Sequence, residues 1–160
     1  MADAEIIAVG SELLTPDRID TNSLWVTAQL NELGVEVRRK VVVGDNRELL
    51  AAAVCQSLAQ VGIVILSGGL GPTEDDITRD AVAQALGRRQ VFRQDLLDAL
   101  IQRFERLHRK MADNNRRQTF VIEGADPLPN GRGTAAGGLL GWQSLLRSCP
   151  SSRVGAAPLR

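Results

Sequence analysis

The sequence predicts an α/β domain built on a mainly parallel sheet with helices on both of its faces. Short apolar segments typical of strands alternate along the chain with longer segments of helical periodicity. The segment 61–66 is almost wholly apolar, which is typical of a central parallel strand covered on both faces. The length of 160 residues and the hydrophobic content of 44% fit one domain of ordinary size.

The first strand, residues 6–9, precedes a helix that is expected to end just before Gly34. The polar side chains of residues 20–22 can cap the first turn of this helix, and a glycine suits its end. A second strand, 35–43, mixes β-branched with basic residues, so part of it should face water. The inward face of the helix is expected to include Leu24, Trp25 and Ala28.

Three more helices are predicted further along the chain. The segment 47–60 follows two polar capping residues and has one face of small and apolar side chains. A short helix is expected at 77–86, ended by a glycine, and a longer amphipathic helix at about 94–112. The apolar residues of the longer helix recur at helical spacing and are predicted to pack into the core: Leu96, Leu97, Leu100, Ile101, Phe104, Leu107 and Met111.

The composition argues against several classes of function. Nineteen basic residues balance nineteen acidic ones, and only 3% of residues are aromatic, which disfavours a nucleic-acid partner. No apolar run approaches the roughly 20 residues of a membrane helix, and the N-terminus lacks the pattern of a secretory signal. Two cysteines and one histidine leave little room for a disulfide framework or a thiolate metal site. We therefore expect a cytoplasmic protein with no membrane partner.

The balance of charge hides an asymmetry between the two halves of the chain. Residues 1–78 contain five basic and twelve acidic residues, whereas residues 79–160 contain fourteen basic and seven acidic residues. The simplest interpretation is that two oppositely charged halves of one domain attract each other.

The clearest functional signal is the segment from Ser67 to Asp76, which follows the apolar strand at 61–66 and reads SGGLGPTEDD. Ligands of parallel sheets bind beyond the carboxyl ends of the strands. Glycines allow a tight turn and close approach of a ligand, and their amides can form an anion-binding nest beside the next helix N-terminus. A proline stiffens the segment and a threonine adds a hydroxyl donor. The predicted ligand-binding residues here are Gly68, Gly69, Gly71, Pro72 and Thr73.

Three consecutive acids, Glu74 to Asp76, complicate a simple phosphate site, because carboxylates repel a bare phosphate. A bridging divalent cation, a bound sugar hydroxyl or a general-base role would each explain them. Alternatively, Asp75 or Asp76 serves only as a helix N-cap. The segment lacks the Lys-Ser/Thr ending of a P-loop and the third glycine of the dinucleotide fingerprint, which disfavours an ordinary NTPase and a Rossmann-type dehydrogenase.

A second cluster follows the first strand. Gly10, Ser11 and Glu12 come directly after it, and the polar residues 20–22 come later. If this strand lies beside the 61–66 strand, these acids and amides converge on the glycine-rich segment. The alternative is a turn at the end of the strand followed by a helix cap. A further glycine-rich segment, 130–138, is weak evidence by itself, because such tracts also serve as linkers.

Four motifs then occur in a specific order: Gly10-Ser11-Glu12-Leu13-Leu14, Asp20-Thr21-Asn22, Val43-Gly44-Asp45-Asn46, and SGGLGPTEDDITR at 67–79. With these motifs in this order, the sequence resembles the N-terminal domain of the competence/damage-inducible CinA family. That domain is itself similar to the molybdopterin-binding domains of molybdenum-cofactor biosynthesis proteins. The fourth motif is highly specific, and the likeness continues to Ala135.

The resemblance implies a three-layer α/β/α domain whose glycine loop binds a phosphorylated ligand, ADP-ribose or a molybdopterin-like compound. It also implies an ADP-ribose pyrophosphatase activity that requires a divalent metal and potassium, and a possible homo-oligomer. Acids that match Asp20 and Asp76 are the functional carboxylates of the molybdopterin-binding relatives, so these two are the predicted catalytic residues. The remaining predicted ligand-binding residues are Gly10, Glu12, Asn22 and Asp75.

The sequence departs from the family pattern at two prolines and at its end. Ile122 and Ala136 stand where prolines are usual, and nothing after Gly138 matches. We therefore expect an incomplete molybdopterin-binding-like domain at 1–138 and a divergent, poorly ordered tail at 139–160, which we attribute to a frameshift or premature stop. The amidase domain of the family is not matched, so no nicotinamide-mononucleotide amidase activity is expected. The alternatives are a non-catalytic pterin-phosphate binding module and an inactive truncated remnant.

Overall fold

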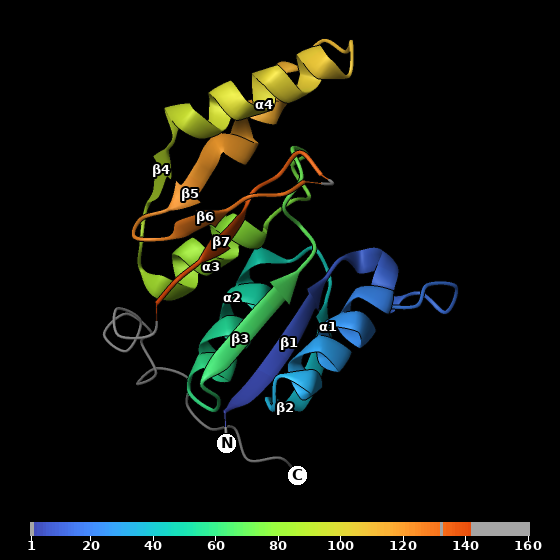
Figure 1. Ribbon diagram of the computed structural model, residues 1–160. Helices are drawn as coiled ribbons and strands as arrows, with labels where there is room; N and C mark the ends of the chain where they lie inside the picture. The colour runs from blue at the N-terminus through green and yellow to red at the C-terminus, as the bar shows by residue number, and fades with distance from the viewer. Residues whose placement is uncertain (1, 132, 142–160) are drawn as a thin grey trace.

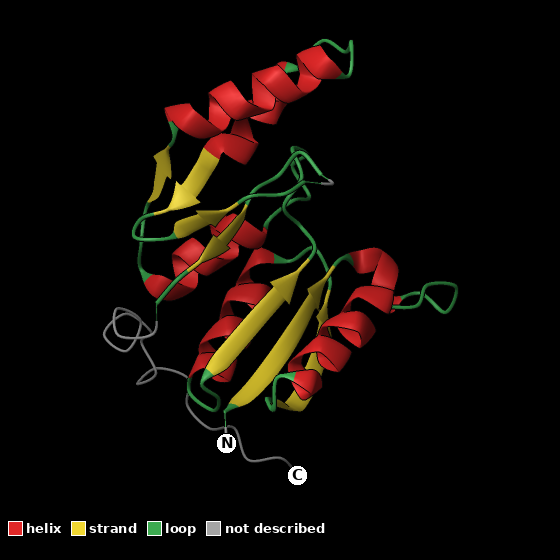
Figure 2. Ribbon diagram, viewed as in Figure 1, coloured by secondary structure: helices red, strands yellow, loops and turns green. Residues whose placement is uncertain are grey.

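The computed structural model describes residues 2–131 and 133–141. Its main sheet has three parallel strands in the order β2-β1-β3, with α1 and α2 on opposite faces (Figure 1). From β1 to α4, strands and helices alternate as predicted (Figure 2). The elements of this part are β1 (Asp3–Val9), the 3-10 helix η1 (Ser11–Leu14), α1 (Thr21–Glu32), β2 (Glu36–Val43), α2 (Arg47–Leu58), β3 (Ile63–Ser67) and α3 (Thr78–Leu86).

The central strand is β1, because it pairs with β2 along one edge and with β3 along the other. Every residue of β1 from Ala4 to Val9 is buried. The prediction that segment 61–66 is the central strand is therefore wrong for the described part of the chain, since β3 lies at the edge of the sheet and its side chains are half-buried. An apolar run indicates a parallel strand, but it does not indicate how many strands pair with it.

The orientation of α1 also differs from the prediction. Leu24 and Trp25 are 55% and 66% exposed, and Ala28 is exposed as well. The side chain that α1 buries is Ser23, two positions into the helix. Apolar residues lie on more than one side of α1, so their spacing did not determine which side faces the sheet.

By contrast, α2 packs as predicted. Its buried residues lie on one face and are Leu50, Ala51, Val54 and Ser57. Leu50, Ala51 and Val54 form a cluster with Ile7 and Val9 of β1 and with the buried side of α3. Asn46 caps the helix by accepting a hydrogen bond from the amide of Leu49 at 2.9 Å.

The second half of the chain forms a smaller lobe beyond α3. In this lobe β4 (Gln90–Phe92) pairs antiparallel with β5 (Phe120–Ile122), and β6 (Asp126–Leu128) pairs antiparallel with β7 (Gly137–Leu139). A 3-10 helix, η2 (Asp113–Thr119), lies between α4 (Gln94–Arg106) and β5. These four strands have only three residues each, which is too short for a pattern of alternation to predict them.

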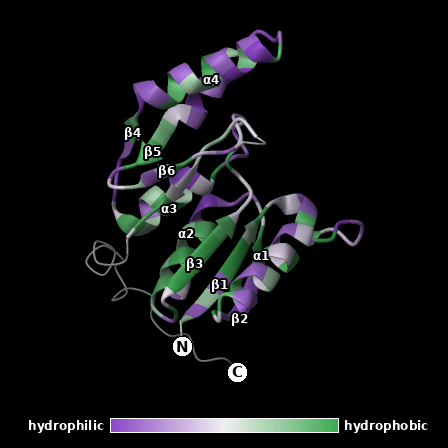
Figure 3. Cartoon of the chain, in the orientation of Figure 1, coloured by the Kyte–Doolittle hydropathy of each residue, from purple (hydrophilic) through white to green (hydrophobic). Residues whose placement is uncertain are grey.

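Helix α4 runs along the outer side of this lobe, away from the main sheet (Figure 1). It was predicted to reach residue 112 and to pack into the core, but it ends at Arg106 and Leu100 is its one buried residue. Ile101 and Leu107 are 37% and 54% exposed. Figure 3 shows hydrophobic residues concentrated in β1 and β3, whereas α4 carries both kinds along its length. The core-packing prediction is therefore wrong for Ile101 and Leu107, whereas Leu100 is buried and Leu96, Leu97 and Phe104 are half-buried.

The predicted boundary at residue 138 falls within β7, and residues 142–160 of the predicted tail lie outside the described residues. Within the described ranges, no helix has the length and apolar character needed to cross a membrane.

Candidate functional site

The glycine loop, residues 68–77, lies beyond the carboxyl end of β3, beside the carboxyl end of β1. Its first two residues, Gly68 and Gly69, have φ angles of 106° and 63°, which favour glycine. A Cβ at Gly68 would collide with the carbonyl oxygen of Val9, and a Cβ at Gly69 would collide with the hydroxyl of Thr78. The packing of the loop against β1 and α3 therefore requires these two glycines, whether or not a ligand is bound.

The carbonyl groups of the loop accept hydrogen bonds from the start of α3. Thr78 Oγ1 donates to the oxygen of Gly68 at 2.8 Å, and the amide of Thr78 donates to the oxygen of Gly69 at 3.1 Å. The Arg79 guanidinium then donates to the oxygens of Leu70 and Gly71, both at 3.0 Å. Four successive carbonyl groups of the loop are thus held by two residues of α3.

The amide groups of Gly69 and Leu70 are in a different situation. Within residues 2–131 and 133–141, neither N–H has a hydrogen-bond acceptor. Adjacent amides in a loop with positive φ angles can form a concave nest that binds an anion. The loop therefore has two adjacent amide donors of the kind that the predicted phosphate site requires.

Asp76, a predicted catalytic residue, is bound to its own loop. Its Oδ2 accepts hydrogen bonds from the amide of Thr73 at 2.8 Å and from the Thr73 hydroxyl at 2.6 Å. Partial burial acts to raise the pKa of Asp76, but the hydrogen bonds from Thr73 and the amide of Gly71 outweigh it and hold the pKa below its usual value. Asp76 is thus an ionised carboxylate that fixes the shape of the loop.

The other acids of the loop are exposed. Glu74 and Asp75 make no hydrogen bond or ion pair with any described residue. Pro72 is half-buried and Thr73 is exposed, apart from its bonds to Asp76. The loop therefore places one fixed carboxylate beside two carboxylates that remain free to meet a ligand.

The second predicted cluster lies at the carboxyl ends of β1 and β2. The amide of Gly10 donates to the oxygen of Val43 at 3.0 Å, and the carboxylate of Glu12 folds back over Gly10. Ser11 and Asp45 exchange two hydrogen bonds, of 3.0 and 2.9 Å, which join the ends of the two strands. The residues that follow β1 thus share the edge of the sheet with the glycine loop.

Asp20, the other predicted catalytic residue, caps α1. Its Oδ1 accepts a hydrogen bond from the amide of Ser23 at 3.0 Å. Asn22 is exposed in the first turn of the same helix. No hydrogen bond joins Asp20, Asn22 or Glu12 to the glycine loop in the part of the chain that the structure describes, so the predicted convergence is limited to the shared edge.

The sequence did not indicate Arg117, which joins the glycine loop to the second lobe. Its guanidinium donates to the oxygen of Thr73 at 2.9 Å and lies 3.4 Å from a carboxylate oxygen of Asp80. Arg79, Asp80 and Arg117 line a small hollow of about 210 Å³ beside Asp76. Spacing could not have found this contact, because Arg117 lies in a 3-10 helix 44 residues away from Thr73.

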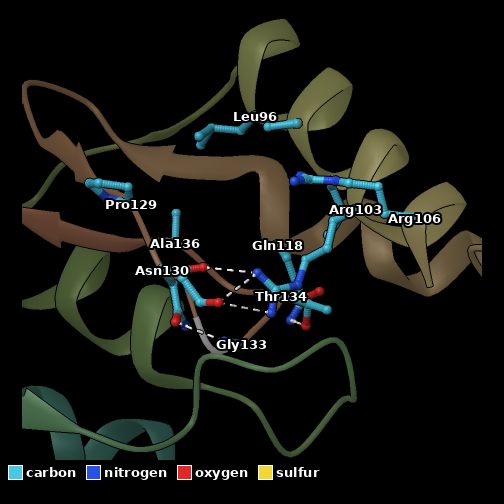
Figure 4. Close-up of a pocket in the computed structure, with 12 residues that line it drawn as sticks. Leu96, Arg103, Arg106, Gln118, Pro129, Asn130, Gly133, Thr134 and Ala136 are labelled. Carbon is cyan, nitrogen blue, oxygen red and sulfur yellow. Dashed lines mark hydrogen bonds between the residues drawn. The ribbon is translucent and has the colours of Figure 1, made fainter.

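A larger hollow, of about 370 Å³, lies between α4 and the segment 129–136 (Figure 4). Arg103 of α4 donates to the oxygens of Asn130 and Gly131 at 3.2 Å, which ties the segment to the helix. Gln118, 4% exposed, donates to the Thr134 hydroxyl at 3.1 Å. Of this hollow, the sequence had indicated only the glycine-rich segment.

The described residues do not form a metal site of their own. They contain no group of three or more His, Cys, Asp or Glu side chains that could hold an ion. Magnesium is often held by one or two carboxylates together with the phosphates of a ligand, and exposed Asp75 fits that pattern. A cation at this site would therefore need the ligand for most of its coordination.

Comparison with known proteins decides the family. Residues 5–157 match the model of the family described as "Probable molybdopterin binding domain". The chain belongs to this family. The family match extends past residue 138, whereas the curated relatives named below align over 134 or 135 residues.

The curated relatives carry the names that the motifs suggested. The chain is 61% identical over 135 residues to a CinA-like protein of Solibacter usitatus, and 49% identical over 134 residues to a putative competence-damage inducible protein of Symbiobacterium thermophilum. Each alignment covers 84% of this chain and 32% of the relative. The chain thus spans about a third of the length of these relatives, and the resemblance to the CinA family is confirmed.

Solved structures confirm the fold. The crystal structure of the protein CinA from Thermoplasma acidophilum superposes with a TM-score of 0.78 at 29% identity, covering 86% of this chain and 80% of that one. A molybdopterin biosynthesis protein from Mycobacterium abscessus superposes with a TM-score of 0.50 at 25% identity, covering 67% and 66%. The molybdopterin-binding α/β fold predicted from the sequence is therefore correct.

Proposed function

We propose that the chain binds the phosphate groups of a small ligand at the glycine loop and hydrolyses a nucleotide pyrophosphate of the ADP-ribose class. The observation that carries the proposal is the pair of adjacent amides, Gly69 and Leu70, which lack an acceptor among the described residues. Two amide donors can neutralise part of the charge that a pyrophosphate develops as its bridging bond breaks.

The acids take separate roles in this proposal. The low pKa of Asp76 makes it a weak general base at neutral pH, so it acts through its charge and its hold on Thr73. Asp20 uses one carboxylate oxygen for its helix cap, which leaves the other oxygen to orient a water molecule or a sugar hydroxyl. Asp75, which is exposed, lies where it can meet a cation that arrives with the ligand.

The requirement for a divalent cation and potassium is part of the proposal. Bound between Asp75 and the phosphates, a divalent cation would supply charge neutralisation. The protein itself supplies the fixed amides, a rigid loop and the carboxylates. Removing free divalent ions with EDTA should therefore abolish hydrolysis, and adding magnesium back should restore it.

The test is to incubate the purified chain with ADP-ribose, magnesium and potassium and to measure release of AMP and ribose 5-phosphate. Asp75→Asn and Asp20→Asn should each lower the rate, whereas Asp98→Asn, an exposed residue of α4, should leave it unchanged. Absence of both products from the folded wild-type protein would contradict the hydrolysis.

A second candidate is a non-catalytic module that binds a pterin phosphate. The engagement of Asp76 within its own loop favours this candidate, because its Oδ2 is bound to Thr73 and its lowered pKa makes it a weak proton acceptor. The description of the family, molybdopterin binding, points the same way. Calorimetric titration with molybdopterin and with ADP-ribose separates the two: a ligand that binds and is not hydrolysed supports the module.

A further inference from the structure

The glycine loop is held from one side. The carbonyl groups of residues 68–71 all accept hydrogen bonds from Thr78 and Arg79, the first two residues of α3. A trans peptide unit is planar, and its C=O and N–H point in opposite directions. Holding the carbonyls of Gly68 and Gly69 on the α3 side therefore directs the amides of Gly69 and Leu70 to the opposite side, where a phosphate can reach them.

Thr78 is built into this arrangement. It is 5% exposed, and its hydroxyl occupies the position that a Cβ at Gly69 would need. Its hydroxyl and its amide each hold one of the two carbonyls that belong to the peptide units of the free amides. Thr78 thus determines the direction of those amides, although its own side chain is buried.

Arg79 holds the next two carbonyl groups of the loop. Its planar guanidinium has two donors that match the two carbonyls of Leu70 and Gly71, which a lysine ammonium cannot reproduce. Burial lowers the pKa of Arg79, and the nearby carboxylates of Asp76 and Asp80 act against that shift. Both terminal nitrogens of the Arg79 guanidinium thus donate to carbonyl groups of the loop.

Arg117 completes the support from the second lobe. It holds the carbonyl of Thr73 and is paired with Asp80 of α3. The loop is therefore supported by α3 at residues 68–71 and by η2 at Thr73. A loop supported in this way has its amides in place before a ligand arrives.

We propose that Thr78 and Arg79 are positioning residues of the phosphate site: they bind the carbonyls of residues 68–71 and thereby aim the loop amides at the ligand. The proposal rests on the proposed function, because it concerns the amides that bind phosphate there. It assigns a role to Thr78 and Arg79, the last two residues of the motif SGGLGPTEDDITR, which were not among the predicted binding or catalytic residues.

Matched variants test it. Thr78→Val keeps the shape of the side chain and removes the hydroxyl, whereas Thr78→Ser keeps the hydroxyl. Arg79→Met removes the guanidinium, and Arg79→Lys keeps a single charged donor. Calorimetry with pyrophosphate and with ADP-ribose should show about a tenfold loss of affinity for the Val and Met variants, as expected for losing hydrogen bonds that hold the donors, and about twofold or less for Ser. The Lys variant should lie between.

A core variant separates positioning from general loss of stability. Val54→Ala removes buried contacts of α2 and should lower the melting temperature without changing the affinity for pyrophosphate. Equal loss of affinity in this variant would overturn the proposal, as would unchanged affinity in both Thr78→Val and Arg79→Met.

A second measurement does not depend on binding. The amide resonances of Gly69, Leu70 and Gly71 in the ligand-free protein should shift in Thr78→Val and Arg79→Met and stay in place in Val54→Ala. If the wild-type protein binds neither pyrophosphate nor ADP-ribose, the proposed function fails, while these resonances still test the positioning. Unchanged resonances in both variants would overturn the positioning alone.

Discussion

Strand β1 and the amphipathic helix α4 both contain several apolar residues, yet these residues are buried to very different depths. Every residue of β1 from Ala4 to Val9 is buried, whereas in α4 only Leu100 is buried. The difference arises from their neighbours. β1 has a strand on each edge and helices on both faces, whereas α4 packs mainly on η2. The spacing of apolar residues therefore predicts whether a segment is a strand or a helix. The elements that pack against the segment determine how deeply its side chains are buried.

The largest expected effect is a difference in stability between the two regions. Leu50→Ala removes a fully buried side chain that packs on β1, and should lower the free energy of unfolding by about 2–5 kcal/mol. Leu107→Ala, just beyond α4 and 54% exposed, should cost less than about 1 kcal/mol. Urea denaturation of both variants measures the difference. Equal losses would show that the second lobe depends on its apolar side chains as strongly as the sheet does.

Two glycines extend the comparison to the loops. Gly68→Ala places a Cβ against the carbonyl oxygen of Val9 at a φ of 106°, so we expect a loss of about 1–3 kcal/mol and weaker binding of pyrophosphate. Gly131→Ala in the second lobe meets no atom within 4 Å and should change stability by less than about 0.5 kcal/mol. Thermal melts and calorimetry measure both quantities. A Gly68→Ala protein that binds normally would show that the loop tolerates a shift away from β1.

The same contrast explains what could be predicted from the sequence. The alternation of strands and helices up to α3 and the position of the glycine loop follow from apolar runs, caps and a specific motif, which are local signals. The order β2-β1-β3 does not follow from them, since the apolar run at 61–66 was assigned to the centre of the sheet. The exposed side of α1 was missed because Leu24 and Trp25 are apolar but face away from the sheet. The contact between Arg117 and Thr73 was missed because it joins residues 44 positions apart through a 3-10 helix. Such contacts depend on tertiary structure, for which residue spacing gives no indication.

The sequence predicted that the loop needs glycines, but the structure gives a different reason for that need. The sequence suggested that glycines make room for a ligand, whereas Gly68 and Gly69 make room for Val9 and Thr78. Similarly, Asp76 was predicted to act on the ligand, and in the structure it binds Thr73. In each case the partner that the structure shows is a neighbouring part of the chain.

The smallest expected effect concerns pH. Because the folded-state pKa of Asp76 is below the ordinary value of 3.8, its stabilising contribution is fully present above that value and is lost as the pH falls through the lower, folded-state pKa. Asp76→Asn keeps an oxygen that can accept a hydrogen bond from Thr73 but removes the charge, so it should cost about 1 kcal/mol at pH 7. The cost should shrink toward zero as the pH falls below the folded-state pKa of Asp76, because protonation then removes the same charge from the wild-type protein.

The control for this prediction is Asp75→Asn, since Asp75 is exposed and makes no hydrogen bond or ion pair with any described residue. Denaturation curves of the wild type and both variants between pH 7 and pH 2 give the comparison. A cost for Asp76→Asn that stays constant over this range would mean that the carboxylate contributes through shape rather than charge. That result would also weaken the role of Asp76 as the fixed negative charge of the proposed site, because a neutral side chain would then hold the loop as well.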